Sequence, residues 1–183
     1  MNNIDYQWLD AGQAQQALPA LCEVLDGCVA QGASIGFIDR DAQRLHHFWQ
    51  DAVLSLACGD KQLLVAKRDG RIVGTVMLVL AMPANGVHRA EVIKLLVHPD
   101  ARRCGIAREL MQQAEARGRE LGRSLLVLDT RSGDAAEPLY LSLGWKVAGQ
   151  IPGYARSTAG VMDATTIMYK VIEHNGSMPA PGA

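Results

Sequence analysis

The stretch VHPDARRCGIARELM, residues 97–111, contains an abrupt change of pattern. An apolar, strand-like run ends at Val97, and Pro99 prevents that strand from simply continuing. Two arginines, a cysteine and the conformationally free Gly105 come next, directly before a segment with the apolar spacing of a helix. The stretch therefore predicts a strand, a charged turn and a helix in immediate succession.

A turn of this kind can bind an anion. The first turn of a helix leaves several backbone N–H groups unpaired and carries partial positive charge, so it binds phosphate readily. Gly105 and the small Ala107 would let the backbone approach a bulky anion, and Arg102 and Arg103 would add charge. The alternative is an ordinary strand-to-helix turn whose two arginines are simply solvated.

Composition narrows the class of protein. The chain has 183 residues, of which 49% are hydrophobic and 20% charged, as in an ordinary globular domain. A net charge of -1 argues against a nucleic-acid partner. The N-terminal segment carries acidic residues where a signal peptide would carry basic ones. No apolar run approaches the length of about 20 residues that a membrane-spanning helix needs. We expect one cytoplasmic domain over 1–173, a disordered tail over 174–183, and neither a nucleic-acid nor a membrane partner.

The four cysteines lack the spacing of a metal site. They are scattered and include no CxxC pair, so we expect no metal and predict reduced, mostly buried thiols. They are Cys22, Cys28, Cys58 and Cys104.

Periodicity along the chain predicts an α/β fold. The expected order is strand, two helices, three strands, helix, strand, helix and two strands, which describes a mixed sheet. Asp69-Gly70 marks a hairpin, and the nearly all-apolar strand over 124–130 is expected to be covered on both faces. The remaining expected strands cover 4–9, 90–98, 146–151 and 165–172, and the expected helices lie within 18–32, 39–59, 105–121 and 134–145.

Signatures of other enzyme classes are missing. The sequence contains no GxxxxGK[ST] and no GxGxxG, so neither a P-loop nor a dinucleotide fingerprint is present. It also has no HExxH, which argues against a zinc protease.

Two segments resemble the GNAT superfamily of N-acetyltransferases. Arg102, Gly105 and Ala107 match its acetyl-CoA signature, R/Q-x-x-G-x-G/A, and AEPLYLSLGW (136–145) resembles its second motif. The resemblance implies a mostly antiparallel mixed sheet with helices on both faces, and acetyl-CoA as co-substrate. Cys104 departs from the signature, which commonly has glycine there, so its side chain must point away from the pyrophosphate.

The resemblance also implies which backbone groups hold acetyl-CoA. Leu95, Leu96 and Val97 would pair with the pantetheine arm as an added strand does, at a bulge where the Val97 amide meets the thioester oxygen. The pyrophosphate would be cradled by the amides of Arg102, Arg103, Cys104, Gly105, Ile106, Ala107 and Arg108.

Three side chains are candidates for proton transfer. Glu91 resembles the family's strand-borne base, and its apolar strand would raise its pKa; the alternative is a glutamate paired with Arg89 or Lys94. Asp129 could share this role or bind the substrate amine, or merely cap the following turn. Tyr140 would protonate the leaving thiolate, or else only pack its ring on the sheet.

A covalent acetyl-cysteine intermediate at Cys104 is disfavoured, because no histidine base is near it in sequence. His46 and His47, on the second expected helix, are predicted to be structural or solvated.

The acceptor is the least determined part of the prediction. GASIGF (32–37), NGVHRAEVIKLLV (85–97), LDTRSGDAAEPLY (128–140) and IPGYA (151–155) resemble tabtoxin-resistance acetyltransferases. The resemblance favours a small polar, amino-acid-like or antibiotic-like amine. A protein or peptide amine, and a regulatory module that binds CoA without turnover, are the alternatives. A homodimer is compatible with the sequence.

Overall fold

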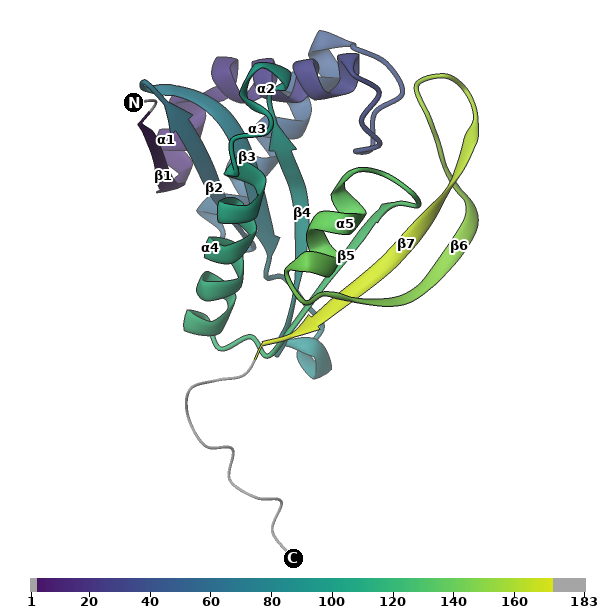
Figure 1. Ribbon diagram of the computed structural model, residues 1–183. Helices are drawn as coiled ribbons and strands as arrows, with labels where there is room; N and C mark the ends of the chain where they lie inside the picture. Colours follow the sequence, from purple (N-terminus) through teal and green to yellow (C-terminus); the bar gives the residue numbers. More distant parts are fainter. Residues whose placement is uncertain (1–2, 173–183) are drawn as a thin grey trace, which may run out of the picture.

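A seven-stranded sheet forms the centre of the computed structural model, which describes residues 3–172 (Figure 1). The strand order is β1-β2-β3-β4-β5-β7-β6, and every neighbouring pair is antiparallel except β4 and β5. The strands are β1 (Ile4–Leu9), β2 (Lys61–Arg68), β3 (Arg71–Val79), β4 (Arg89–Val97), β5 (Leu125–Arg131), β6 (Lys146–Arg156) and β7 (Met162–Val171). The predicted mixed, mostly antiparallel sheet is therefore confirmed. The tail expected over 174–183 lies outside the described residues.

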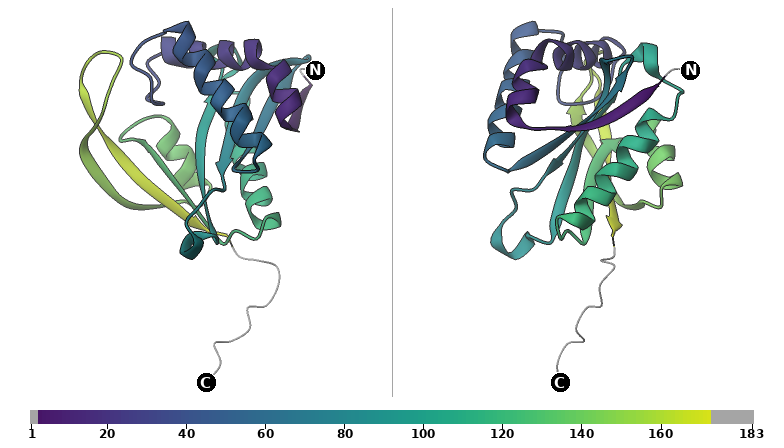
Figure 2. Two further views of the ribbon diagram at one scale, coloured as in Figure 1. Left: turned by 180° about the vertical axis from the view of Figure 1, so that it is seen from behind. Right: turned by 90° about the vertical axis from the view of Figure 1, so that its left-hand side faces the viewer.

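Helices cover both faces of this sheet, as expected (Figure 2). One face carries α1 (Ala11–Gln16), α2 (Leu18–Ala30) and α3 (Ala42–Ala57), and the other carries α4 (Ile106–Glu120) and α5 (Ala136–Ser142). Two short 3-10 turns, η1 (Ala84–Gly86) and η2 (Pro99–Ala101), flank β4. The sequence did not predict α1, although Asp10 and Gln13 form a reciprocal capping box at its start.

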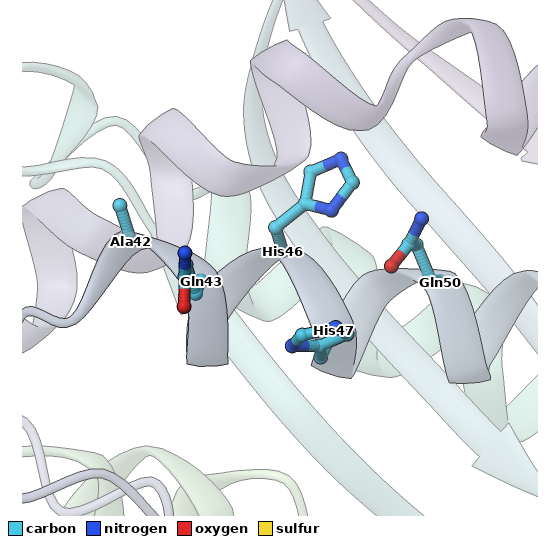
Figure 3. Close-up of a pocket in the computed structure, with 5 residues that line it drawn as sticks. All are labelled: Ala42, Gln43, His46, His47 and Gln50. Carbon is cyan, nitrogen blue, oxygen red and sulfur yellow. The ribbon is translucent and has the colours of Figure 1, made fainter.

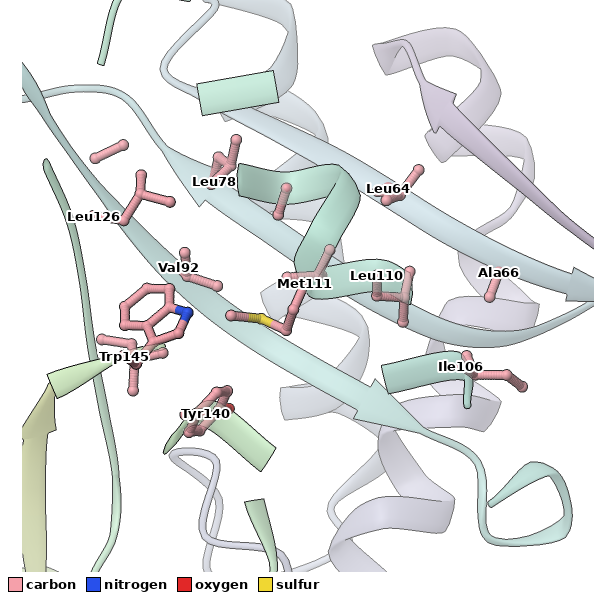
Figure 4. Packing of buried hydrophobic residues seen from close by; sticks show 14 of the residues in the cluster. Leu64, Ala66, Leu78, Val92, Ile106, Leu110, Met111, Leu126, Tyr140 and Trp145 are labelled. Carbon is pink, nitrogen blue, oxygen red and sulfur yellow. The ribbon is translucent and has the colours of Figure 1, made fainter. Parts of the chain in front are cut away.

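The hydrophobic core has two parts, one on each side of the sheet. Between the sheet and α4, a cluster includes Ile106, Leu110 and Met111 together with Trp145 near α5 (Figure 4). The second cluster packs α2 and α3 on the other face around Trp49, which is completely buried. Because β2, β3 and β4 lie between the two clusters, they form the rigid platform from which the functional segments extend.

Two expectations about burial are wrong. Of the cysteines, which are all free thiols, only Cys28 is buried, whereas Cys58 and Cys104 are exposed because they follow the end of α3 and precede the start of α4. β5 is covered on one face only: Leu126 and Leu128 are buried, but Asp129 is exposed. The helices over β2 and β3 do not extend across the other face of β5 (Figure 2).

The two central strands part soon after they begin. β4 and β5 pair only from Arg89 with Leu125 to Glu91 with Val127, and they diverge beyond this rung (Figure 1). β4 also contains a bulge, because its register against β3 gains one residue between Ile93 and Leu96. The divergence and the bulge together shape the candidate site.

Candidate active site

A pocket of about 660 Å³ fills the opening between β4 and β5. Its walls come from the second half of β4, the end of β5, the loop after α2, the start of α5 and the β6–β7 hairpin. The pocket is thus lined by the strand and the carboxylates that the sequence singled out, and it reaches the turn before α4 at Arg102 and Ala107. Local chain order places them there, because β4 leads directly into the turn before α4.

The β4 edge that faces β5 is open along the expected acetyl-CoA strand. Leu96 and Val97 pair with β3 on the other side, at Thr75 and Gly74. Within residues 3–172, no strand pairs with β4 on the β5 side beyond Glu91. An extended ligand can therefore form hydrogen bonds with this edge as an extra strand would. The bulge expected near Val97 is present, and its left-handed residue is Lys94.

The turn before α4 presents unpaired amides to solvent. In the described part of the chain, the backbone N–H groups from Arg103 to Arg108 donate to no protein acceptor. Arg103 and Gly105 adopt left-handed φ angles of 64° and 76°, and a Cβ at Gly105 would meet no atom within 4 Å. This open arc of donors at a helix N-terminus fits a pyrophosphate in charge and in available space.

The side chains of this turn lie around the arc and do not fill it. Arg102 donates through Nε to the Val97 carbonyl at 3.4 Å, and Arg108 reaches Ser142 Oγ on α5 at 2.9 Å. The exposed Cys104 Sγ lies 3.4 Å from the Arg102 carbonyl. Both arginines therefore link the turn to neighbouring elements, and their charge remains beside the amides.

Glu91 is a half-buried carboxylate in the pocket wall. Burial is the largest cause that raises its pKa, and the charge of Asp129 raises it further, whereas Lys94, Lys61 and Arg89 lower it. The raised pKa agrees with the expectation from its apolar strand. No salt bridge among residues 3–172 joins Glu91 to Arg89 or Lys94. The ion-paired alternative is therefore not what the structure contains.

Asp129 lies on β5 in the same pocket, and its carboxylate is exposed. Thr165 Oγ1 on β7 lies 3.1 Å from its Oδ2 and 3.0 Å from the Thr130 carbonyl, so these two acceptors share one hydroxyl donor. The contact orients the carboxylate across the sheet, so Asp129 does not act as the cap of the following turn. Asp129 and Glu91 are thus two carboxylates in one opening.

Tyr140 lies on α5 at the opposite wall and is 6% exposed. Its ring packs beside Trp145, with centroids 6.1 Å apart (Figure 4). Burial raises its pKa well above that of a free phenol, and Asp134 and Asp129 raise it further. The hydroxyl therefore stays protonated at neutral pH.

Sequence reasoning missed two cations of this site. Lys94 and Arg131 line the pocket from β4 and β5, each next to a predicted carboxylate. Arg131 lies 3.4 Å from Asp134 and 3.6 Å from Asp163, so these two acids share one cation. The available signal was a cation in a mostly apolar strand, Lys94 within β4 and Arg131 at the end of β5.

A second hollow lies on the outer surface of α3 and has no matching chemistry (Figure 3). It is lined by Ala42, Gln43, His46, His47 and Gln50, all from one helix. Both histidines are exposed, which agrees with their prediction as solvated residues. In the described part of the chain, no three His, Cys, Asp or Glu side chains are grouped to hold a metal ion. The same residues include no helix long and apolar enough to cross a membrane.

Comparison with known proteins agrees with this site. Residues 32–145 match the family model described as the acetyltransferase (GNAT) family. The chain is 29% identical over 144 residues to an uncharacterized N-acetyltransferase from the hisH-hisA intergenic region of Azospirillum brasilense, which covers 76% of this chain and 84% of the relative.

Two solved structures share the fold over nearly the whole chain. The first is yncA from Salmonella typhimurium, provisionally described as an acetyltransferase and solved with acetyl-CoA: its TM-score is 0.75 at 21% identity, with 98% of this chain and 99% of that one covered. The second is a ribosomal-protein-alanine N-acetyltransferase from Brucella melitensis, with a TM-score of 0.75 at 24% identity, covering 91% and 99%.

Proposed function

The chain belongs to the acetyltransferase (GNAT) family and is an N-acetyltransferase, and from this premise we propose that it acetylates a small, polar, cationic amine directly from acetyl-CoA. The observation that carries this proposal is the pair Glu91 and Asp129 in one pocket with the open β4 edge. The pair supplies an amine-binding, proton-accepting end next to a strand edge that can hold the acetyl donor.

Acetyl-CoA is the acetyl donor of this family, and the turn before α4 has the right chemistry for its pyrophosphate. The free amides of Arg103 to Arg108 supply neutral donors, and Arg102 and Arg108 supply charge. We assign the extended pantetheine arm to the backbone of Leu95, Leu96 and Val97, since this edge lacks a neighbouring strand.

The charges of the pocket favour a cationic acceptor. Asp134 and Asp163 share the single cation Arg131, whereas Glu91 and Asp129 form no salt bridge among the described residues. Lys94 adds one positive charge to this end of the pocket, against the two negative charges of Glu91 and Asp129, so the acceptor end stays net negative and would attract an ammonium group. The likeness of four short stretches to tabtoxin-resistance acetyltransferases supports an amino-acid-like molecule as the carrier of that amine.

In the proposed reaction, two side chains transfer protons and one backbone amide stabilises the developing negative charge. Glu91, assisted by Asp129, accepts a proton from the bound ammonium, because only the neutral amine has a lone pair with which to attack the thioester carbon. A β4 amide near Val97 donates to the thioester oxygen as negative charge develops there. Tyr140 donates its proton to the leaving sulfur and is reprotonated by the second proton that the nitrogen loses as the amide forms. The products are an amide and free CoA thiol, and the first proton leaves Glu91 for solvent.

Two measurements test the proposed function. Acetyl-CoA should raise the melting temperature, because a ligand that binds only the folded state stabilises it. Free thiol should then appear when L-lysine, spermidine or kanamycin is added, with the amino acid giving the highest rate. Stabilisation without thiol release from any of these amines, or from a peptide with a free N-terminus, would favour the CoA-binding regulatory module.

A further inference from the structure

Lys94 occupies the bulge in the middle of β4. Its φ angle is 53°, a left-handed conformation that residues with a Cβ rarely adopt. Thr75 on β3 donates from Oγ1 to the Lys94 carbonyl at 2.9 Å and thereby fixes the bulged backbone. The surrounding strands hold an unfavourable conformation here, at the strand edge we assign to acetyl-CoA.

The bulge determines which way the Lys94 side chain points. In a regular strand, neighbouring residues face opposite sides of the sheet. Ile93 packs with the core under α2 and α3, and the extra residue allows Lys94 to reach the same side. Lys94 therefore lies on the face of the pocket that carries the loop after α2.

The Lys94 ammonium contacts a backbone carbonyl and an aromatic ring of that loop, and a second ring on α3. Nζ donates to the Ile35 carbonyl at 2.7 Å. It also lies 5.8 Å from the ring centroid of Phe37 and 4.9 Å from that of Phe48, within cation–π range. The two rings contact each other edge to face. Lys94 thus joins the β4 bulge to residues 32–37, which we name the acceptor loop.

A second cation holds the other end of the acceptor loop. Arg131 on β5 donates from Nη1 to the Gly32 carbonyl at 3.1 Å. The loop is therefore bound to β4 through Ile35 and to β5 through Gly32, at a level where the two strands no longer pair with each other. Ser34, Ile35 and Gly36 line the same pocket as Glu91 and Asp129.

We propose that Lys94 is a positioning residue for the acceptor: from the bulge in β4, its ammonium holds the acceptor loop across the opening between β4 and β5. It touches neither reactant in this role. It sets the distance between the loop, which borders the acceptor, and the β4 edge, which borders the acetyl donor. The inference rests on the proposed function, because that function makes this end of the pocket the acceptor end.

The variant Lys94→Met tests this role, because methionine keeps the unbranched side chain and the Cβ but removes the ammonium. Lys94→Arg restores a cation that can donate to the Ile35 carbonyl. Lys61→Met is the matched control: Lys61 also lowers the pKa of Glu91, but it is a β2 residue outside the pocket lining. All three variants are first checked for unchanged stabilisation by acetyl-CoA.

Hydrogen exchange of Gly32 and Ala33, the two acceptor-loop amides that donate to protein carbonyls (of Val29 and Cys28), is the readout that needs no acceptor substrate. Exchange should accelerate about tenfold or more in Lys94→Met, the effect of losing one hydrogen bond to a charged group, and should remain at the wild-type rate in Lys61→Met. Lys94→Arg should recover most of the protection. Unchanged exchange in Lys94→Met would overturn the proposal, whether or not the enzyme acetylates any tested amine.

Steady-state kinetics with L-lysine, spermidine or kanamycin, whichever releases most thiol, supply the second readout. We expect the acceptor KM of Lys94→Met to rise about tenfold, with kcat and the acetyl-CoA KM nearly unchanged. A fall in kcat together with a rise in both KM values would indicate a purely structural role of Lys94 and would overturn the proposal. Faster exchange with an unchanged acceptor KM would also overturn it. No thiol release by the wild type with any of the amines would defeat the proposed function, while the exchange result would still decide on Lys94.

Discussion

Glu91 and Asp129 share one face of the sheet, because Glu91 pairs with Val127 and Asp129 lies two residues farther along β5. Partner residues in a parallel pair project to the same side, and side chains on a strand alternate with period two. Glu91 and Val127 are the last paired residues before β4 and β5 diverge, so Asp129 lies just inside the opening between these strands. Strand geometry thus brings two carboxylates together at the point where a substrate can enter.

The first prediction follows from this coupling. The charge of Asp129 helps to raise the pKa of Glu91, so Asp129→Asn should lower that pKa. A 13C NMR titration of the Glu91 carboxyl group measures the change directly. Asp163→Asn is the control, because Asp163 is a pocket acid that pairs with Arg131. An unchanged Glu91 midpoint in Asp129→Asn would mean that the two charges are not coupled.

Stability should reflect the same raised pKa. A glutamate that binds its proton more tightly in the folded than in the unfolded state makes the free energy of unfolding fall as pH rises between the two pKa values. Glu91→Gln cannot lose this proton, so it should be more stable than the wild type above that window and lose this advantage below it. Urea unfolding at about pH 3.5 and about pH 8, on either side of the ordinary glutamate range, tests the sign.

The pyrophosphate assignment depends on Gly105. Gly105→Glu should abolish the stabilisation by acetyl-CoA, because the carboxylate would project among the amides and repel the pyrophosphate. Gly59→Glu is a matched control, since Gly59 has a φ of 78° and equally open surroundings but follows α3 at the other end of the sheet. Both variants carry the same backbone cost. Stabilisation retained in Gly105→Glu would locate the cofactor elsewhere.

Local patterns were enough to predict most of the fold and part of the site. The Asp69-Gly70 hairpin was predicted correctly, because its φ values of 52° and 81° are those that the dipeptide favours. The segment from Val97 to Gly105 was also predicted, since its strand, turn and helix signals follow each other directly in the chain.

Features that depend on distant partners could not be predicted in this way. The direction of Lys94 depends on the register between β3 and β4, which no local pattern encodes. The open face of β5 depends on how far α2 and α3 extend over the sheet. The sequence of an apolar strand does not indicate whether a helix covers one of its faces or both. α1 was missed because its six residues are too few for a clear period.

Cys104 offers a test of direct transfer. Its thiol is exposed beside the pyrophosphate turn, so Cys104→Ala should retain most activity and acetyl-CoA binding. Incubation of the wild type with acetyl-CoA before any acceptor is added should yield no acetylated protein by intact mass. A stoichiometric acetyl group on the protein, absent in Cys104→Ala, would instead indicate a covalent intermediate at this residue.

A buried ion pair next to the second motif should matter for stability and not for catalysis. Glu115 on α4 has a side chain only 6% exposed, bonded to Lys170 Nζ at 2.6 Å and to Trp145 Nε1 at 2.9 Å. Lys170→Met leaves this carboxylate without its cation and should cost about 3–5 kcal/mol of unfolding free energy. Arg40→Met, which breaks the exposed pair with Asp26, should cost far less, because solvent screens that pair. Equal losses in the two variants would contradict this distinction.

The last prediction separates the proton acceptor from the proton donor. Glu91→Gln keeps the shape of the side chain but removes the base, so the acetylation rate should fall by roughly 10²–10⁴. The loss should shrink as pH rises, because more of the amine is then already neutral. Tyr140→Phe should also slow turnover, but higher pH should not rescue it, since the leaving sulfur still lacks its donor. Acetyl-CoA should still stabilise both variants, which controls for folding. Near-normal activity in Glu91→Gln together with an inactive Asp129→Asn would reassign the base to Asp129. Activity in both carboxylate variants would mean that the amine loses its proton to solvent and that the pocket acts mainly by positioning its two substrates next to each other.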